Sequence, residues 1–332
     1  MSRSSRPLSR EWPSLTREAA PARVAIVGAG RVGSSIAYAC LIRGVARHLV
    51  LYDIDAARVR AEVLDLSHGR QFAPAAEVSG GNDLDVCRDA DVVVITAGAN
   101  QKPGETRLDL VRTNVALCSE LVPRLTALAP RAILLLVTNP VDVLTHVCRE
   151  LSGWPTERVL GTGTTLDTSR FRHALGTRCS VDVRNVHAFI VGEHGDSELP
   201  LWSSATIAGA PVDEWLKAQG GPFKDGEREE LFVGVRDAAY EVIRGKGATH
   251  YAIGLTAARL LEAILDDESA IVPVSAGIKG AYGLEAVTMS LPRLLNRRGA
   301  GAIVPLPLSD NERAALGRSA DTIRSIVSGV GF

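Results

Sequence analysis

The chain has 332 residues, of which 46% are hydrophobic, and a formal net charge of −1. This length is sufficient for two domains that share a large core. The balanced charge gives no excess of either sign that would attract nucleic acid or an anionic membrane surface, so we expect neither partner. The longest apolar runs, such as residues 132–137, fall far short of the about 20 residues that a spanning helix needs.

The five cysteines are scattered and form no CxxC pair: Cys40, Cys87, Cys118, Cys148 and Cys179. An odd number without metal-ligand spacing indicates reduced, mostly structural thiols, no metal site and a cytoplasmic location. Residues 1–21 are rich in Ser, Arg and Pro and lack the continuous apolar core of a signal peptide. We expect them to form a mobile or loosely docked extension.

A nucleotide-binding pattern begins at residue 23. A short apolar strand at 23–27 is followed by the glycine-rich loop 28–33, a helical pattern at 34–43 and a second apolar strand at 48–52. Asp53 ends this second strand, 20 positions after the last glycine of the loop. A GxGxxG sequence alone is a weak signal, but in this strand–loop–helix–strand context it predicts dinucleotide binding.

Each part of this pattern has a physical reason. Gly28 permits the tight turn, Gly30 lets a pyrophosphate approach the backbone, and Gly33 packs the helix closely on the sheet. The helix N-terminus then offers free N–H groups to phosphate. Asp53 can accept bonds from both ribose hydroxyls and would repel a 2′-phosphate, so NAD is favoured over NADP. The alternative is a glycine-rich turn in some other α/β protein.

Alternating strands and helices continue through the first half of the chain. Continuous apolar strands are expected at 91–96 and 132–138, as in a parallel sheet with both faces covered. Helices are expected at 56–66 and 106–128. This alternation predicts an α/β fold with a Rossmann-type, doubly wound parallel sheet from about residue 22 to about 160. Further on we expect helices at 227–244, 249–265 and 309–327, and an antiparallel sheet built from 271–274, 287–291 and 303–306.

A histidine ends an apolar run in the second half. Residues 189–191 read as a buried strand, and His194 follows between Gly192 and Gly195. Histidine exchanges protons near neutral pH, although a lone histidine at a strand end is more often structural. Residues 161–172 read as a loop and then a Thr-capped helix on which Asp167 and Arg170 share one face. They form either an ordinary ion pair, or one orients a histidine while the other binds an anion.

Polar residues also follow two central strands, where ligands bind in open α/β sheets. Residues 98–107 are punctuated by Gly and Pro, which suits a hinged lid that carries Gln101 and Arg107. An exposed arginine at the start of a helix is the ordinary alternative. Asn139 precedes a proline at the next strand end, a turn signal that places its amide at the same edge.

Taken together, seven segments resemble the lactate/malate dehydrogenase family, and specifically its bacterial L-lactate dehydrogenases. They are GAGRVG, Asp53, AGANQKPGETRLDL, TNPVD, LGTGTTLDTSRFR, NVHAFIVGEHGDSELP and GATHYAIG. The resemblance runs from about residue 22 to the C-terminus. It implies an NAD-binding domain at 22–160, an α+β catalytic domain at 161–332, a homotetramer, and the interconversion of pyruvate and lactate.

The resemblance also implies residue roles. His194 is the proton donor and acceptor at the substrate oxygen, Asp167 orients its imidazole, and Arg170 binds the substrate carboxylate with a bidentate fork. Arg107 polarises the carbonyl. The implied pocket and nicotinamide contacts are Asn139, Thr249 and Ile253. Further implied cofactor contacts are Val32, Arg58, Gly98, Ala99, Val137, Asn139 and Thr162.

Gln101 bears on the choice of substrate. The malate branch is similar but has an arginine here, which pairs with the second carboxylate of oxaloacetate. A neutral amide leaves that charge unpaired, which costs several kcal/mol or about a thousandfold in discrimination. Pyruvate is therefore favoured, while malate or a bulkier L-2-hydroxy acid remains an alternative substrate.

Two more residues match an activator site of the bacterial enzymes. Arg172 and His187 stand at positions that bind fructose 1,6-bisphosphate, and a twofold axis would bring two copies of each together. A surface arginine and a strand histidine are the ordinary interpretation. In a different class, a non-catalytic NAD-binding protein would be expected to lack part of the set His194, Asp167, Arg170 and Arg107, and all four are present. A short-chain dehydrogenase would need a tyrosine followed four residues later by lysine, which this chain lacks.

Overall fold

The computed structural model describes residues 21–99 and 106–332. The expected N-terminal extension and Gln101 lie outside the described residues. Arg107 is the first residue of helix α3 (Arg107–Leu128), and its side chain also lies outside the description. Among the described helices, none is both long and apolar enough to cross a membrane.

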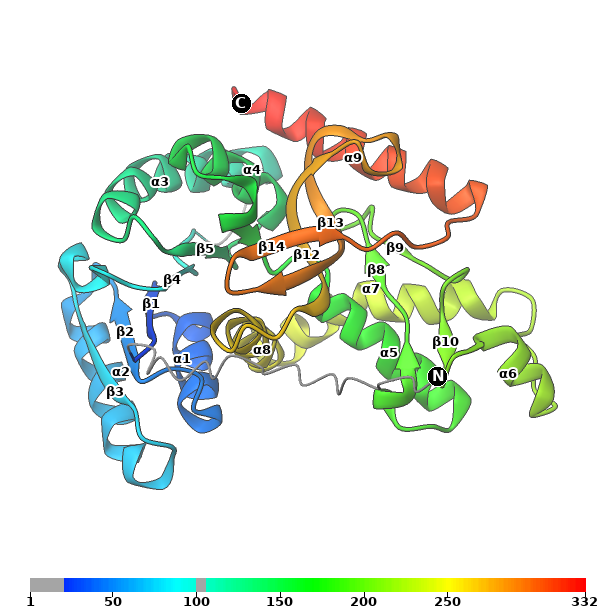
Figure 1. Ribbon diagram of the computed structural model, residues 1–332, viewed down its shortest axis with the longest axis horizontal. Helices are drawn as coiled ribbons and strands as arrows, with labels where there is room; N and C mark the ends of the chain where they lie inside the picture. The colour runs from blue at the N-terminus through cyan, green and yellow to red at the C-terminus, as the bar shows by residue number, and fades with distance from the viewer. Residues whose placement is uncertain (1–20, 100–105) are drawn as a thin grey trace, which may run out of the picture.

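A nine-stranded sheet runs through the molecule in the order β14-β13-β12-β6-β5-β4-β1-β2-β3 (Figure 1). Six of its strands are parallel: β1 Arg23–Val27, β2 His48–Tyr52, β3 Glu77–Gly81, β4 Val92–Ile95, β5 Ile133–Leu136 and β6 Val159–Gly161. The other three are antiparallel: β12 Ala270–Lys279, β13 Glu285–Asn296 and β14 Gly299–Ile303. The two parts meet where Ser275 of β12 pairs with Gly161 of β6.

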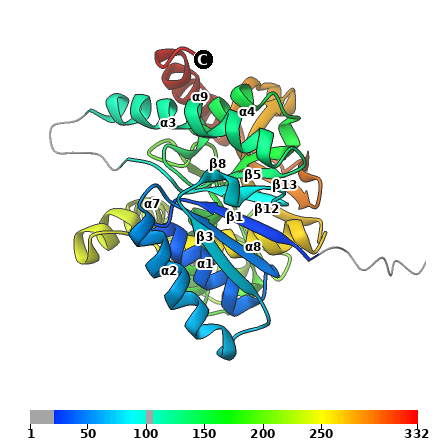
Figure 2. The same ribbon diagram turned by 90° about the vertical axis from the view of Figure 1, so that its left-hand side faces the viewer.

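Helices cover both faces of the sheet (Figure 2). One layer holds α1 Arg31–Arg43, α2 Ala56–Gly69 and α8 Tyr251–Leu265, and the other holds α3, α4 Val141–Ser152 and α9 Asp310–Gly329. Side chains of a strand alternate between these layers. Val24 and Ile26 of β1 pack with the first layer, and Ala25 and Val27 pack with the second. Burial on both sides explains why the parallel strands are continuously apolar.

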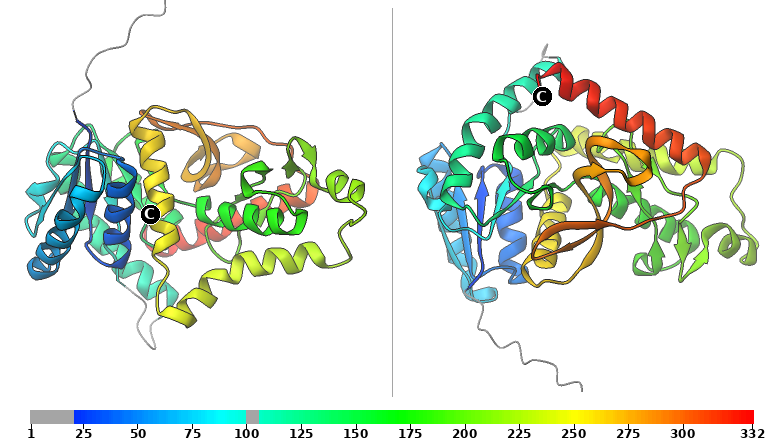
Figure 3. Two further views of the ribbon diagram at one scale, coloured as in Figure 1. Left: turned by 90° about the horizontal axis from the view of Figure 1, so that it is seen from below. Right: turned by 45° about the horizontal axis from the view of Figure 1, so that its top comes forward.

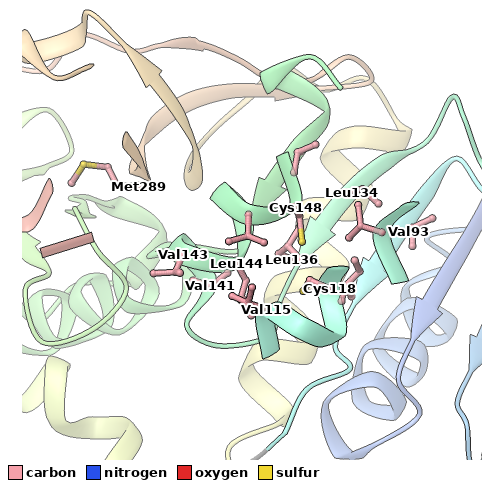
Figure 4. Close-up of a cluster of buried hydrophobic side chains, with 14 of the residues drawn as sticks. Val93, Val115, Cys118, Leu134, Leu136, Val141, Val143, Leu144, Cys148 and Met289 are labelled. Atoms are coloured by element: carbon pink, nitrogen blue, oxygen red, sulfur yellow. The ribbon is translucent and has the colours of Figure 1, made fainter. Parts of the chain in front are cut away.

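The second layer packs as a dry core between the sheet and helices α3 and α4 (Figure 4). Cys118 of α3 and Cys148 of α4 are buried in it, and all five cysteines are buried and free. Cys118 and Cys148 belong to a cluster with Val93, Val115, Leu134, Leu136, Val141, Val143, Leu144 and Met289. The thiols therefore act as small apolar side chains here.

A smaller lobe carries the segments around His194. It contains α5 Thr165–Cys179, α6 Val212–Ala218 and α7 Glu227–Lys246. Its short strands are β7 Val186–His187, β10 Thr206–Ile207 and β11 Ala210–Pro211 in one sheet, and β8 Ile190–Val191 with β9 Leu199–Pro200 in another. The 3-10 helices are η1 Arg70–Phe72, η2 Leu84–Cys87, η3 Thr156–Arg158, η4 Val183–Asn185 and η5 Ala281–Gly283. Helix α8 lies between α1 and α5 and contacts both, so it joins this lobe to the Rossmann half (Figure 3).

The predicted α/β fold class is confirmed, and strands 23–27 and 48–52 have the predicted bounds. The predicted antiparallel sheet exists, and it extends the parallel sheet because β12 pairs with β6. Its last strand was predicted wrongly at 303–306 and lies at 299–303. The pattern at 303–306 is apolar because Ile303 and Leu306 pack on the core, although the strand itself ends at Ile303.

Candidate active site

His194 lies in a loop that several elements hold in place. Strand β8 ends two residues before Glu193, and Gly192 exchanges backbone hydrogen bonds with Ser290 of β13 at 2.9 and 3.0 Å. Gly192 has φ of +95°, and a Cβ there would come within 2.8 Å of the Ser319 hydroxyl. Glycine is therefore required at this turn, which aims His194 away from the strand.

Three of the predicted residues come together beside this loop. Nδ1 of His194 lies 2.6 Å from Oδ2 of Asp167, and Nη1 of Arg170 donates to Oδ1 of the same carboxylate at 2.8 Å. The side chain of Asp167 is 3% exposed, whereas that of His194 is 27% exposed. Asp167 thus holds the ring through Nδ1, while the His194 side chain keeps partial access to solvent. Arg170 is 18% exposed, and its remaining N–H groups can bind a second anion.

Charge and burial set the protonation of this pair. Burial lowers the pKa of His194, but the charge and hydrogen bond of Asp167 outweigh it and raise that pKa to about 9. Burial likewise opposes ionisation of Asp167, yet the cations His194 and Arg170 hold its pKa below the usual range. At neutral pH the arrangement is an imidazolium on an ionised carboxylate, which is the protonation state of a proton donor.

Asp142, to which we assigned no role from the sequence, fixes the backbone of the histidine. It lies in the first turn of α4 and is 2% exposed. Its carboxylate accepts hydrogen bonds from the His194 N–H at 2.7 Å and from the Ser275 hydroxyl at 2.6 Å. Burial raises its pKa to about 6 despite these bonds. The TNPVD segment contains Asp142, but nothing local in the sequence indicates a partner so far along the chain.

A threonine stands at the N-cap of helix α5, as predicted, but its hydroxyl does not make the capping bond. Thr164 is the N-cap residue, but its side chain caps no helix N–H. Its hydroxyl instead donates to the carbonyl of Ile190 in β8 at 2.6 Å, and Thr168 also donates to that carbonyl. These bonds dock α5, with Asp167 and Arg170, against the strand that leads to His194. The Thr164 hydroxyl thus bonds to a strand far along the chain and not, as its position suggests, to an N–H of its own helix.

The nucleotide turn has the geometry expected of a pyrophosphate cradle. Gly28 has φ of +107°, and a Cβ on Gly33 would overlap the carbonyl oxygen of Gly28. A Cβ on Gly30, by contrast, would meet no described atom within 4 Å. That open space lies at the N-terminus of α1, where free N–H groups and the helix dipole favour an anion. Asp53 accepts a hydrogen bond from Ala29 N–H at 2.8 Å, so its carboxylate lies against the same turn.

A buried asparagine joins the two loops that leave β4 and β5. Asn114 of α3 is 1% exposed, accepts a bond from Ala99 N–H at 2.8 Å and donates to the carbonyl of Asn139 at 2.9 Å. The predicted residues Gly98 and Ala99 are thereby held near Asn139. We did not single out Asn114 from the sequence, and a polar residue on the buried side of an amphipathic helix is the signal that could have found it.

Helix α8 brings two further predicted residues against the nucleotide half. Its Gly254 packs on the Ser35 backbone of α1, and the ring of His250 lies 3.1 Å from the Ser35 hydroxyl. Ile253 is partly buried against the layer that contains α1, and Thr249 lies just before the helix begins. The remaining predicted cofactor residues lie as follows: Val32 partly buried on α1, Arg58 exposed on α2, Val137 after β5 and Thr162 buried after β6.

The two predicted activator residues lie near each other. Arg172 of α5 donates its Nε–H to the carbonyl of Ala188 at 2.9 Å, with its guanidinium over the Phe189 ring at 5.0 Å. His187, the neighbour of Ala188 in sequence, is exposed on β7. This contact thus joins Arg172 to the backbone of the residue that follows His187.

Asp167, His194 and Glu198 also present possible metal-ligand atoms within 4.8 Å of one another. The His194 Nδ1 atom, however, is already engaged by Asp167.

A nucleotide turn at the carboxyl end of β1, together with a protonated histidine and an adjacent arginine, defines a nicotinamide-dependent dehydrogenase acting on a small anion.

Comparison with known proteins places the chain within that class. Residues 22–161 match the lactate/malate dehydrogenase, NAD binding domain, and residues 164–330 match the lactate/malate dehydrogenase, alpha/beta C-terminal domain. The chain belongs to the lactate/malate dehydrogenase family, and its first half is an NAD-binding domain of that family.

Individual relatives are similar over almost the whole chain. An L-lactate dehydrogenase of Bifidobacterium animalis subsp. lactis is 49% identical over 94% of this chain and 98% of its own. An L-lactate dehydrogenase of Thermoanaerobacter sp. is 46% identical over 92% and 98%. The crystal structure of the minor L-lactate dehydrogenase from Enterococcus mundtii, in a ligands-bound form, superposes with a TM-score of 0.90 at 40% identity, over 93% of this chain and 98% of that one.

Proposed function

We propose that the chain is an NAD-dependent L-lactate dehydrogenase that interconverts pyruvate and (S)-lactate. The observation that carries the proposal is the hydrogen bond of 2.6 Å between His194 and the buried carboxylate of Asp167, with Arg170 on the other carboxylate oxygen. It is supported by relatives at 46–49% identity that are named L-lactate dehydrogenase.

The chain's own residues divide the work of the reaction. Arg170 binds the substrate carboxylate with the N–H groups that Asp167 does not engage. His194, protonated at neutral pH, donates its proton to the carbonyl oxygen of pyruvate and takes it back from lactate. Asp167 accepts the hydrogen bond from His194 Nδ1, which fixes the orientation of the ring, and its negative charge stabilises the imidazolium. Arg107, at the start of α3, polarises the carbonyl.

The cofactor takes the redox half of the chemistry. Bound NADH supplies the hydride. Gly30 leaves space for the pyrophosphate at the N-terminus of α1, Gly28 and Gly33 permit the tight turn and the close packing of the helix that form this space, and Asp53 binds the adenosine ribose. The remaining proposed contacts are Val32, Arg58, Gly98, Ala99, Val137, Asn139, Thr162 and Ile253, with Asn139 and Thr249 lining the substrate pocket.

Gln101 supports pyruvate over oxaloacetate, since a neutral amide leaves a second carboxylate without a partner. We further propose a division into domains at 22–160 and 161–332, a cytoplasmic location and a homotetramer. In that tetramer, Arg172 and His187 of two subunits bind fructose 1,6-bisphosphate as an activator. The contact between Arg172 and Ala188, at 2.9 Å, supports this pairing because it holds the arginine next to His187.

The test is NADH oxidation with pyruvate and with oxaloacetate, each with and without fructose 1,6-bisphosphate. We expect kcat/KM to favour pyruvate by about a thousandfold, and the Gln101→Arg variant to lose most of that preference. The bisphosphate should lower the KM for pyruvate in the parent, and the Arg172→Ala variant should lose this response while keeping its basal rate. A preference for oxaloacetate would overturn the substrate assignment. A response unchanged in Arg172→Ala would overturn the activator site alone.

A further inference from the structure

Glu198 is a buried carboxyl group that the mechanism above does not use. It lies immediately before β9, where its N–H donates to the carbonyl of Gly195 at 3.2 Å. The residue is 6% exposed, and its Oε1 atom receives no hydrogen bond from any described residue. A buried acidic oxygen without a donor calls for an explanation, because such groups are almost always hydrogen-bonded.

Its surroundings contain another acid. A carboxyl oxygen of Glu198, an Asp167 oxygen and a His194 ring nitrogen all lie within 4.8 Å of one another. The charged groups that face Glu198 are Asp167 and Arg170 from α5 and His194 from its own loop. Beyond His194 lies the carboxylate of Asp142, bound to the His194 N–H at 2.7 Å.

Only one of the two neighbouring acids has cations of its own. Asp167 is bonded to His194 through one oxygen and to Arg170 through the other. Two carboxylates this close cannot both be ionised in a water-poor site, and the one with cationic partners keeps the charge. Burial, and then the negative charge of Asp167, raise the pKa of Glu198 to about 9.

We propose that Glu198 is a positioning residue that stays protonated at neutral pH and directs its O–H toward the carboxylate of Asp167, so that Glu198 adds no further negative charge beside the His194 ring. The inference rests on the proposed role of His194 as proton donor. A second negative charge beside the ring would make the imidazolium a weaker acid and slow proton transfer to pyruvate. The Glu198 proton does not move during turnover.

The first test is the pH dependence of kcat/KM for pyruvate, which falls at alkaline pH as free His194 loses its proton. In Glu198→Gln, one neutral donor replaces another at neutral pH, and Glu198 itself ionises only near pH 9, so we expect the alkaline pKa to fall by less than about one. In Glu198→Ala the donor is lost, and we expect kcat/KM to fall about tenfold. Glu312→Gln, a buried glutamate on α9 that binds Ser203, is the matched control and should leave the profile unchanged.

A fall of about one or more in the alkaline pKa of Glu198→Gln would overturn the proposal, because only removal of a nearby negative charge has that effect. An unchanged kcat/KM in Glu198→Ala would overturn the positioning role. Neither outcome touches the proposed function. That function fails instead if the parent reduces no 2-oxo acid, or if replacing His194 leaves turnover intact.

Infrared spectroscopy tests the proton directly and does not require turnover. At about pH 7.5, the difference spectrum obtained by subtracting Glu198→Gln from the parent should contain the C=O stretching band of a protonated carboxylic acid. Asp142 does not interfere, because its pKa of about 6 leaves it ionised there. If the variant does not fold, the parent alone can be tested, because the carboxylic acid band of the parent should fade as pH rises past about 9. Absence of the band would overturn the proposal.

Discussion

The glycine turn after β1 is made by neighbours in sequence, whereas the histidine site gathers residues from segments far apart. In the turn, residues 28–33 and Asp53 lie within one strand–helix–strand unit, and their spacing alone indicates their use. At the histidine, Asp142, Asp167 and Ser275 come from α4, α5 and β12. Damage to the turn should therefore affect local packing and cofactor affinity, and damage at the histidine should affect chemistry.

The largest effect should come from Asp167→Asn. Without the carboxylate the imidazolium loses its stabilising charge, and kcat for pyruvate reduction should fall about ten thousandfold, as when a triad aspartate is replaced by asparagine. The pKa of His194 should drop from about 9, which moves the alkaline limb of the pH profile to lower pH. Stopped-flow turnover and a pH profile measure both effects.

The control for that variant is Asp182→Asn, which removes an exposed carboxylate paired with Arg184. It should leave kcat unchanged. NADH affinity, followed by fluorescence, should stay within about twofold in Asp167→Asn, because distant sites are nearly independent. A loss of kcat below about tenfold would contradict the role assigned to Asp167.

A second prediction separates packing from cofactor binding within the turn. The methyl of Gly33→Ala overlaps the Gly28 carbonyl, so this variant should lose about 2 kcal/mol of unfolding free energy and bind NADH at least about tenfold more weakly. Gly30→Ala is the matched variant, because its methyl meets no described atom within 4 Å.

Gly30→Ala should stay within about 0.5 kcal/mol of the parent in urea unfolding, since the poorer N-cap and the lower unfolded-state entropy act in opposite directions. It should still lose about tenfold or more in NADH affinity, because its methyl takes space reserved for the pyrophosphate. Equal stability losses in the two variants would show that packing, not cofactor space, governs residue 30.

How far the sequence predicts each site follows from the same contrast. The turn, Asp53 and the neighbouring strands follow from spacing, because their partners lie within one local unit. The residues alone left open whether Asp167 orients a histidine, and the family resemblance assigned that role to Asp167 and identified the histidine as His194. Asp142 was missed because a contact across 52 residues leaves no periodic signal. Asn114 was missed although its polar side chain on the buried side of α3 is such a signal. Thr164 was misjudged for the same reason as Asp142, since its hydroxyl binds Ile190 and not its own helix.

The smallest effect on turnover, and the clearest on stability, should come from Asp142→Asn. The pKa of Asp142 is raised by burial from 3.8 to about 6, so the folded state favours its protonated form. The stability that the folded state gains from protonated Asp142 is complete below about pH 4 and is lost as pH rises through about 6. Relative to the parent, Asp142→Asn should therefore gain about 3 kcal/mol of unfolding free energy between about pH 4 and about pH 6, and then level off.

The amide oxygen that Asp142→Asn introduces can still accept the His194 N–H, so kcat should fall less than about tenfold. Urea unfolding of both proteins at several pH values, with kcat measured alongside, makes the comparison. A difference in stability that does not change with pH would mean that Asp142 titrates near its ordinary range. A drop in kcat as large as that of Asp167→Asn would mean that the backbone anchor matters as much as the charge behind the ring. The effects on kcat would then no longer distinguish Asp142, which positions the His194 backbone, from Asp167, which takes part in the chemistry.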